Sequence, residues 1–167
     1  METGPVDAFS HLAVIAQVSA TLLGFIAVFI VLSRDDGRFS ESDKHFIQAM
    51  VLSGAYAFAV SLIPGTVSYF LSATALWMLS LGIAVLIGLA SMAYQAWEQI
   101  RMSREEAAKI HWAWHLIAWG IGFVMAALLF AGLLGWAPPD AMYVTSATLS
   151  VILALWSFIA VVFRKFF

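Results

Sequence analysis

Residues 7–33 read DAFSHLAVIAQVSATLLGFIAVFIVLS. After Asp7 this stretch contains no Asp, Glu, Lys or Arg, and the next charged residue is Arg34. A helix needs about 20 predominantly apolar residues to cross the hydrocarbon core of a bilayer. The residues before it include Glu2 and lack the basic segment of a secretory signal peptide, so we expect the stretch to be retained as a membrane-spanning helix.

Four further segments have a similar length and character. The hydrophobic fraction is 63% and the charged fraction 11%, and the mean hydropathy is +0.94. A soluble domain of this composition would expose very large apolar patches. We therefore predict an all-α integral membrane protein, a five-helix transmembrane bundle in which residues 1–167 form a single transmembrane domain. The spans are expected at about 7–33, 46–70, 75–97, 110–134 and 141–163.

Two connections carry signals for the start of a helix. Ser40 precedes acidic residues at positions 41 and 43, which is typical of a hydroxyl N-cap followed by acids near the positive end of the helix dipole. Pro138 and Pro139 predict a sharp stop, and we expect Asp140 to cap the fifth span.

The basic residues fall between the first and second spans, between the third and fourth, and after the fifth. Lys and Arg that flank spans remain on the cytoplasmic side. With five spans all eight lie on one side, whereas an even number of spans would divide them. We therefore expect the N-terminus outside and the C-terminus in the cytoplasm, in a bacterial inner (plasma) membrane. The eight are Arg34, Arg38, Lys44, Arg101, Arg104, Lys109, Arg164 and Lys165.

The first span carries a row of polar and small residues. Asp7, Ser10, Gln17, Thr21 and Gly24 follow spacings of three, seven, four and three, which place them approximately along one helix face. Such a face can line a hydrated pore with an acidic outer mouth and an apolar constriction further along. The alternative is that Gln17 hydrogen-bonds a neighbouring helix and so stabilises the packing of the two helices.

The second span carries small residues at every fourth position: Ala49, Ser53, Ala57, Ser61 and Gly65. Small residues at this spacing let two helix backbones approach closely in lipid. They serve packing inside one bundle or packing between subunits. Since similar rows occur on the other spans, we expect self-association into a homo-oligomer.

Pro64 interrupts the second span. A proline lacks an amide N–H, so it frees a backbone carbonyl one turn earlier and bends the helix. Transporters use such breaks to bind ions, while a simple bend near the end of a span is the alternative.

Three histidines are expected near the cytoplasmic interface. His111 and His115 lie one turn apart on the fourth span, and His45 lies at the same depth on the second. Two histidines at this spacing can bind zinc when further ligands are present. Sensing of pH and anchoring at the interface are the alternatives, and the sequence has no His-Glu-x-x-His pattern.

No Asp, Glu, Lys or Arg lies in the centre of an expected span. This argues against proton-coupled transport, voltage sensing and catalysis, so we predict neither enzyme activity nor a cofactor. The net charge of -2 does not favour a nucleic-acid partner, which leaves the lipid bilayer and other membrane proteins. The leading hypothesis is a small homo-oligomeric channel for ions or small solutes. The main alternative is a non-catalytic accessory or scaffold subunit of a membrane complex, and a third is a lipid-modifying enzyme centred on His111 and His115.

Overall fold

The computed structural model describes residues 5–33, 40–103, 105 and 112–166 of the chain. Nearly all of them belong to five long helices, each long and apolar enough to cross a membrane. The prediction of an all-α fold with five such helices is confirmed. The helices are α1 (Pro5–Ser33), α2 (Glu41–Val67), α3 (Ala73–Arg101), α5 (Trp112–Leu133) and α6 (Pro139–Phe166).

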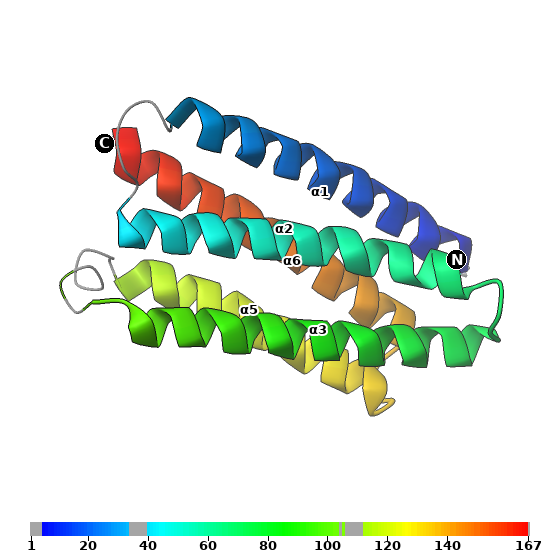
Figure 1. Cartoon of the computed structure of the whole chain (residues 1–167). Helices are drawn as coiled ribbons and strands as arrows, with labels where there is room; N and C mark the ends of the chain where they lie inside the picture. The colour runs from blue at the N-terminus through cyan, green and yellow to red at the C-terminus, as the bar shows by residue number, and fades with distance from the viewer. Residues whose placement is uncertain (1–4, 34–39, 104, 106–111, 167) are drawn as a thin grey trace.

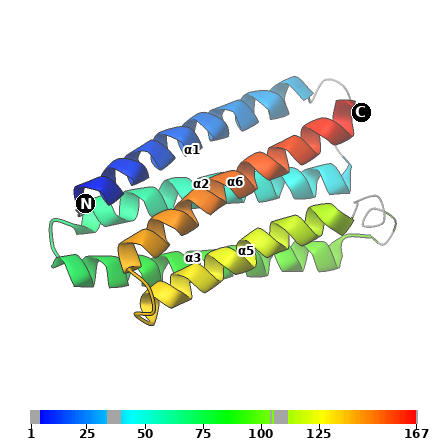
Figure 2. The same ribbon diagram turned by 180° about the vertical axis from the view of Figure 1, so that it is seen from behind.

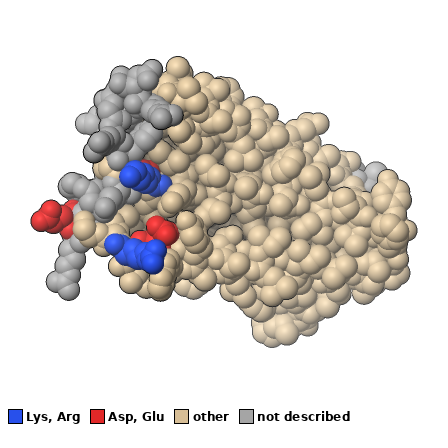
Figure 3. All heavy atoms as spheres, viewed as in Figure 1, with Lys and Arg blue, Asp and Glu red and all other residues tan. Residues whose placement is uncertain are grey.

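Successive helices run in opposite directions, so the two ends of the chain lie at opposite ends of the bundle (Figure 1). The described Lys44 and Arg101 lie at the end where α2 begins and α3 ends, which we call the basic end. Figure 3 shows the charged side chains of the visible face gathered at this end, while the remaining length of that face carries none.

α6 is the central helix of the bundle. It packs against α1, α2, α3 and α5, and it crosses the bundle diagonally when the molecule is viewed from behind (Figure 2). α1 packs against α2 and α6 on one side of the bundle, and α5 packs against α3 and α6 on the other. Each of these outer helices therefore leaves a broad face uncovered by the chain itself.

The helix starts agree in part with the sequence signals. The Ser40 hydroxyl accepts the N–H of Asp43 at 3.1 Å, and the Asp43 carboxylate accepts the N–H of Ser40 at 3.2 Å. This capping box confirms the predicted start of α2. The expectation for Asp140 is wrong, because α6 begins at Pro139 and Asp140 lies inside its first turn. Proline suits the first helical position since its φ is preset and its missing N–H is not needed there.

A tight turn joins α5 to α6. Gly135 adopts a φ of 71°, and the N–H of Trp136 donates to the carbonyl of Ala131 at 2.9 Å. This arrangement closes the end of α5 with a left-handed residue, a conformation that glycine adopts without steric cost. The turn holds α5 and α6 as an antiparallel pair.

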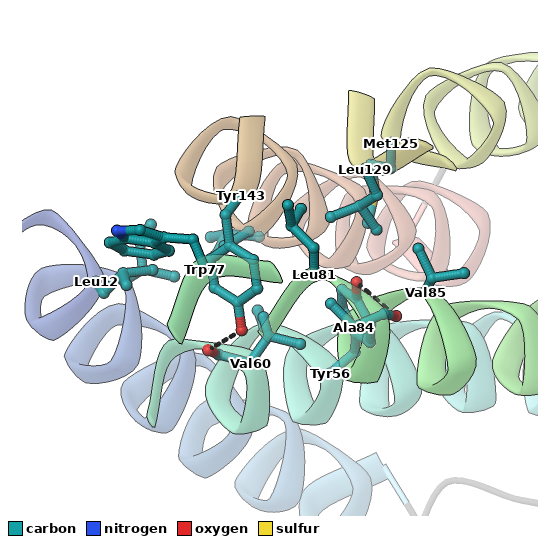
Figure 4. Packing of buried hydrophobic residues seen from close by; sticks show 14 of the residues in the cluster. Leu12, Tyr56, Val60, Trp77, Leu81, Ala84, Val85, Met125, Leu129 and Tyr143 are labelled. Atoms are coloured by element: carbon teal, nitrogen blue, oxygen red, sulfur yellow. Dashed lines mark hydrogen bonds between the residues drawn. The ribbon is translucent and has the colours of Figure 1, made fainter. Parts of the chain in front are cut away.

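The largest cluster of buried apolar residues fills the half of the bundle away from the basic end. It combines residues from all five helices, including Leu12, Tyr56, Leu81, Leu129 and Tyr143. Figure 4 shows their side chains packed between the helices. Near the basic end, buried apolar clusters join α1, α2 and α6, so the space next to α3 and α5 is less completely filled there.

Pro64 lies inside α2 and its missing N–H leaves the carbonyl of Val60 without its partner along the helix. The Tyr143 hydroxyl of α6 donates to this carbonyl at 2.6 Å, as the dashed line in Figure 4 marks. The freed carbonyl is thus occupied by a side chain of the same protein. The bond joins α2 to α6 inside the core and leaves no open carbonyl at Val60 for an ion.

Candidate functional site

Two groups of polar residues stand out in this apolar bundle. The first is the α1 polar face, which we define as Asp7, Ser10, Gln17, Thr21 and Gly24. Ser10, Gln17, Thr21 and Gly24 are all exposed, and the side chain of Asp7 lies outside the described part of the chain.

The face of α1 that packs against α2 and α6 carries other residues. Leu12, Ile15, Leu22 and Ile26 are buried on it, together with Ser19. The structure therefore turns the α1 polar face away from the rest of the chain. Gln17 is exposed and its side chain makes no hydrogen bond to another described helix, so it does not join helices within the bundle.

The chemistry of the α1 polar face centres on one side chain. The Thr21 hydroxyl donates to the backbone carbonyl of Gln17 at 2.9 Å and is satisfied within the helix. The Gln17 carboxamide makes no hydrogen bond to the other described residues. A carboxamide has two N–H donors and an acceptor oxygen, so Gln17 requires water or another protein chain beside it.

The small-residue row on α2 is divided between two environments. Ala49, Ser53, Ala57 and Ser61 are buried. Gly65 is exposed, and a Cβ added there would meet nothing within 4 Å. The first four lie inside the bundle, where α2 packs against α6, α1 and α3.

The second group is the histidine cluster, which we define as His45 of α2, Gln99 of α3, and His115 and Trp119 of α5. The centroids of the His45 and His115 rings lie 6.0 Å apart. Gln99 Nε2 lies 2.8 Å from His115 Nδ1 and 3.5 Å from His45 Nε2. Trp119 Nε1 donates to Gln99 Oε1 at 3.2 Å. Three helices thus meet through one glutamine.

These contacts fix which atoms donate. An indole N–H can only donate, so the oxygen of Gln99 faces Trp119 and its amide nitrogen faces the two histidines. The ring nitrogens that face this amide therefore act as acceptors. In neutral rings the remaining N–H groups are His45 Nδ1 and His115 Nε2, and neither makes a hydrogen bond to the described residues.

His45 and His115 come from different helices and are brought together, whereas His111 lies outside the described residues. Within the described part of the chain, no group of three or more His, Cys, Asp and Glu side chains is arranged to hold a metal ion. Sequence reasoning missed Gln99 and Trp119. The spacing of polar residues could have indicated them. Gln99 follows Gln95 by four residues and Trp119 follows His115 by four, so each pair shares one helix face.

Three adjoining hollows lie at or next to the histidine cluster. The mouth, of about 260 Å³, opens at the basic end and is lined by Lys44, His45, Gln48, Glu98, Arg101 and Met102. The neck, of about 50 Å³, is lined by the histidine cluster and by Trp156. The chamber, of about 60 Å³, lies deeper and is mostly apolar. Met92, Gln95, Gly122 and Leu153 line both the neck and the chamber.

Fold and composition together indicate an integral membrane protein whose five described helices are long and apolar enough to span a bilayer. In comparisons with known protein families, with curated proteins and with solved structures, nothing matches the chain.

Proposed function

We propose that the chain assembles into a homo-oligomeric channel for ions or small solutes, in which the α1 polar face of each subunit lines a pore on the oligomer axis. The observation that carries the proposal is the outward exposure of Gln17 close to the middle of α1. A pore between subunits needs a polar face directed away from its own bundle, and α1 has one.

The energetic argument concerns what surrounds Gln17 in a membrane. An amide moved into hydrocarbon without a hydrogen-bond partner costs roughly 4–8 kcal/mol. A ring of subunits with α1 innermost replaces this lipid contact by water or by the glutamine of a neighbour. Self-association through the α1 polar face therefore removes an unsatisfied carboxamide from contact with lipid.

A pore through one bundle is less favourable. The half of the bundle away from the basic end is filled by buried apolar residues from all five helices. Further along α1, the exposed Val28 and Leu32 follow the polar residues toward the basic end. Apolar side chains in such positions form a constriction that gates by dewetting.

The proposed orientation places the basic end in the cytoplasm and the N-terminus outside. Support comes from the antiparallel arrangement, because it puts the helix ends that carry Lys44 and Arg101 at the same end of the bundle. Basic residues flanking spans are retained on the cytoplasmic side. We accordingly propose a bacterial inner membrane with the pore entrance on its outer side.

Single cysteine variants test the channel, because the natural chain has no cysteine. We would introduce Gln17→Cys and Thr21→Cys, and use Phe123→Cys as the matched control on the exposed surface of α5. Each variant is reconstituted in liposomes, and the flux of K⁺, Cl⁻ and a small polyol is measured before and after a charged thiol reagent. We expect the reagent to modify positions 17 and 21 and to reduce flux, while position 123 stays in lipid and unmodified.

The opposite pattern of flux and thiol reactivity would contradict the proposal. If the wild type conducts nothing and the thiols at 17 and 21 react no faster than the thiol at 123, the α1 polar face does not line a pore. Protection of these thiols by a second membrane protein that co-purifies in fixed stoichiometry would instead favour the scaffold alternative.

A further inference from the structure

The three hollows beside the histidine cluster change in polarity with depth. The mouth is lined mainly by charged and polar residues, the neck combines ring nitrogens with aromatic faces, and the chamber is mostly apolar. This order matches an amphiphile standing in the membrane leaflet at the basic end, with its head at the interface and its tail toward the membrane centre. The site is separate from the α1 polar face.

The neck presents donors without acceptors to match them. His45 is 7% exposed, and its ring N–H has no acceptor among the described residues. The same holds for the ring N–H of His115, and the indole nitrogen of Trp156 is buried without a hydrogen-bond partner. A buried donor such as this indole N–H normally finds an acceptor, and the two ring N–H groups line the same neck, so a molecule rich in acceptor oxygens fits here.

The charge at the mouth favours an anion. Among the described residues that line it, Lys44 and Arg101 are cations and Glu98 is the acid. The guanidinium of Arg101 lies 4.7 Å from the centroid of the Trp97 ring, which holds this cation at the membrane interface. Phosphate oxygens satisfy both the cations of the mouth and the N–H groups of the neck.

The chamber reaches the lipid-facing surface of the bundle. Leu89 of α3 is 47% exposed and Phe130 of α5 is 44% exposed, and both line the chamber. Its inner walls include Tyr56, Val85 and Met125, which Figure 4 shows in the packed core. An apolar chain can therefore enter from the membrane and end against this core.

We propose that the mouth, neck and chamber bind one anionic phospholipid from the leaflet at the basic end. Its phosphate lies between Lys44 and Arg101, one oxygen accepts the N–H of His45, and the end of one acyl chain enters the chamber. The site recognises the head by charge and donors, and the chain by apolar contact.

Native mass spectrometry of the full chain in a neutral detergent tests this site. Phosphatidylglycerol, phosphatidylcholine with the same acyl chains, and inorganic phosphate are titrated separately. We expect one phosphatidylglycerol to bind at concentrations where phosphatidylcholine and inorganic phosphate do not. Replacing Lys44 or Arg101 by Gln is expected to weaken phosphatidylglycerol binding by about fivefold for each cation.

A pair of glycines on α5 provides a matched control. Gly122 lines the neck and chamber, and an added Cβ there meets Met92 only at ordinary contact distances of 3.7 and 4.0 Å. Gly122→Leu therefore fills the hollow, and we expect it to weaken phosphatidylglycerol binding by about tenfold. Gly120 is exposed on the same helix with nothing within 4 Å of an added Cβ, so Gly120→Leu should bind as the wild type does.

Three results would overturn the inference. They are equal binding of phosphatidylcholine and phosphatidylglycerol, equally strong binding of inorganic phosphate alone, and phosphatidylglycerol binding unchanged in Lys44→Gln and Arg101→Gln. Both cations are exposed, so these two variants decide the question even when Gly122→Leu does not fold. Flux of the wild type in phosphatidylcholine liposomes remains an independent test of the channel.

Discussion

Removing the hydroxyl of Tyr143 tests how the core tolerates the proline in α2. In Tyr143→Phe the carbonyl of Val60 loses its donor, and Pro64 offers no N–H to replace it. Tyr143 is 1% exposed and Val60 is 2% exposed, so water does not reach the carbonyl. Leaving a buried acceptor unsatisfied costs about 1–3 kcal/mol, and we expect a loss of about 2 kcal/mol in the free energy of unfolding.

The measurement is reversible unfolding in mixed micelles of lipid and denaturing detergent, followed by circular dichroism. Tyr56→Phe is the matched control, because it removes a hydroxyl that donates to the carbonyl of Ala84 at 3.2 Å. Ala84 lies in the regular part of α3, where its carbonyl also accepts a bond within the helix. We expect a loss of about 0.6 kcal/mol for this variant, the average for a hydrogen bond between membrane helices.

Pro64→Ala supplies the missing N–H and completes a double-mutant cycle. In that background the carbonyl of Val60 keeps one donor, so Tyr143→Phe should cost only about 0.6 kcal/mol. An equal cost in both backgrounds, or an equal cost for Tyr143→Phe and Tyr56→Phe, would refute the reasoning. The bond would then be an ordinary interhelical contact with no special relation to the proline.

The remaining predictions concern packing, the histidine cluster and a helix cap. An added Cβ at Gly132 would lie 3.1 Å from the nearest side-chain atom of α3 and 3.2 Å from the nearest of α6, so Gly132→Ala should destabilise the bundle by about 1–3 kcal/mol in the same unfolding assay. Gly120→Ala, which meets no atom within 4 Å, should instead stabilise it by about 0.5–1 kcal/mol; destabilisation by both would mean that close packing is not the cause. Gln99→Leu leaves a tryptophan N–H without its acceptor and should cost about 1–3 kcal/mol, with a changed tryptophan fluorescence spectrum, whereas Gln95→Leu should change the spectrum less. Ser40→Ala removes the capping box of α2 and should cost about 1 kcal/mol; no change in unfolding free energy would mean that the cap does not stabilise the helix.

The fold was predictable because each helix has its own signal in the chain. Long apolar segments and the acidic start after Ser40 depend on nearby residues alone, and the structure contains all five helices and this cap. The error at Asp140 has a local cause. The preset φ of Pro139 already suits the first helical turn, so the helix begins one residue before the acid.

The contacts between helices were less predictable, because they depend on which faces meet. The sequence placed Gln17 and Thr21 on one face of α1 but did not determine whether that face points inward or outward. It also showed that Pro64 frees a carbonyl without identifying Tyr143, which lies far along the chain, as the donor. The similar depth of His45 and His115 along their spans indicated that the two residues could lie close together. The position of the Gln99 side chain between them depends on how α3 is rotated about its axis, which the sequence does not show.

The central place of α6 has a consequence for how the bundle assembles during synthesis. Without α6, most contacts among the other described helices are the sequential pairings of α1 with α2, α2 with α3, and α3 with α5. Ring contacts such as His45 with His115 add to these pairings. The carbonyl of Val60 also lacks its hydrogen-bond donor until α6 brings Tyr143 into place. α6 therefore adds contacts to α1, α2, α3 and α5 and joins these pairs into a closed bundle. A nascent chain arrested before Pro139 would thus leave uncovered the faces of α1, α2, α3 and α5 that α6 covers in the finished bundle.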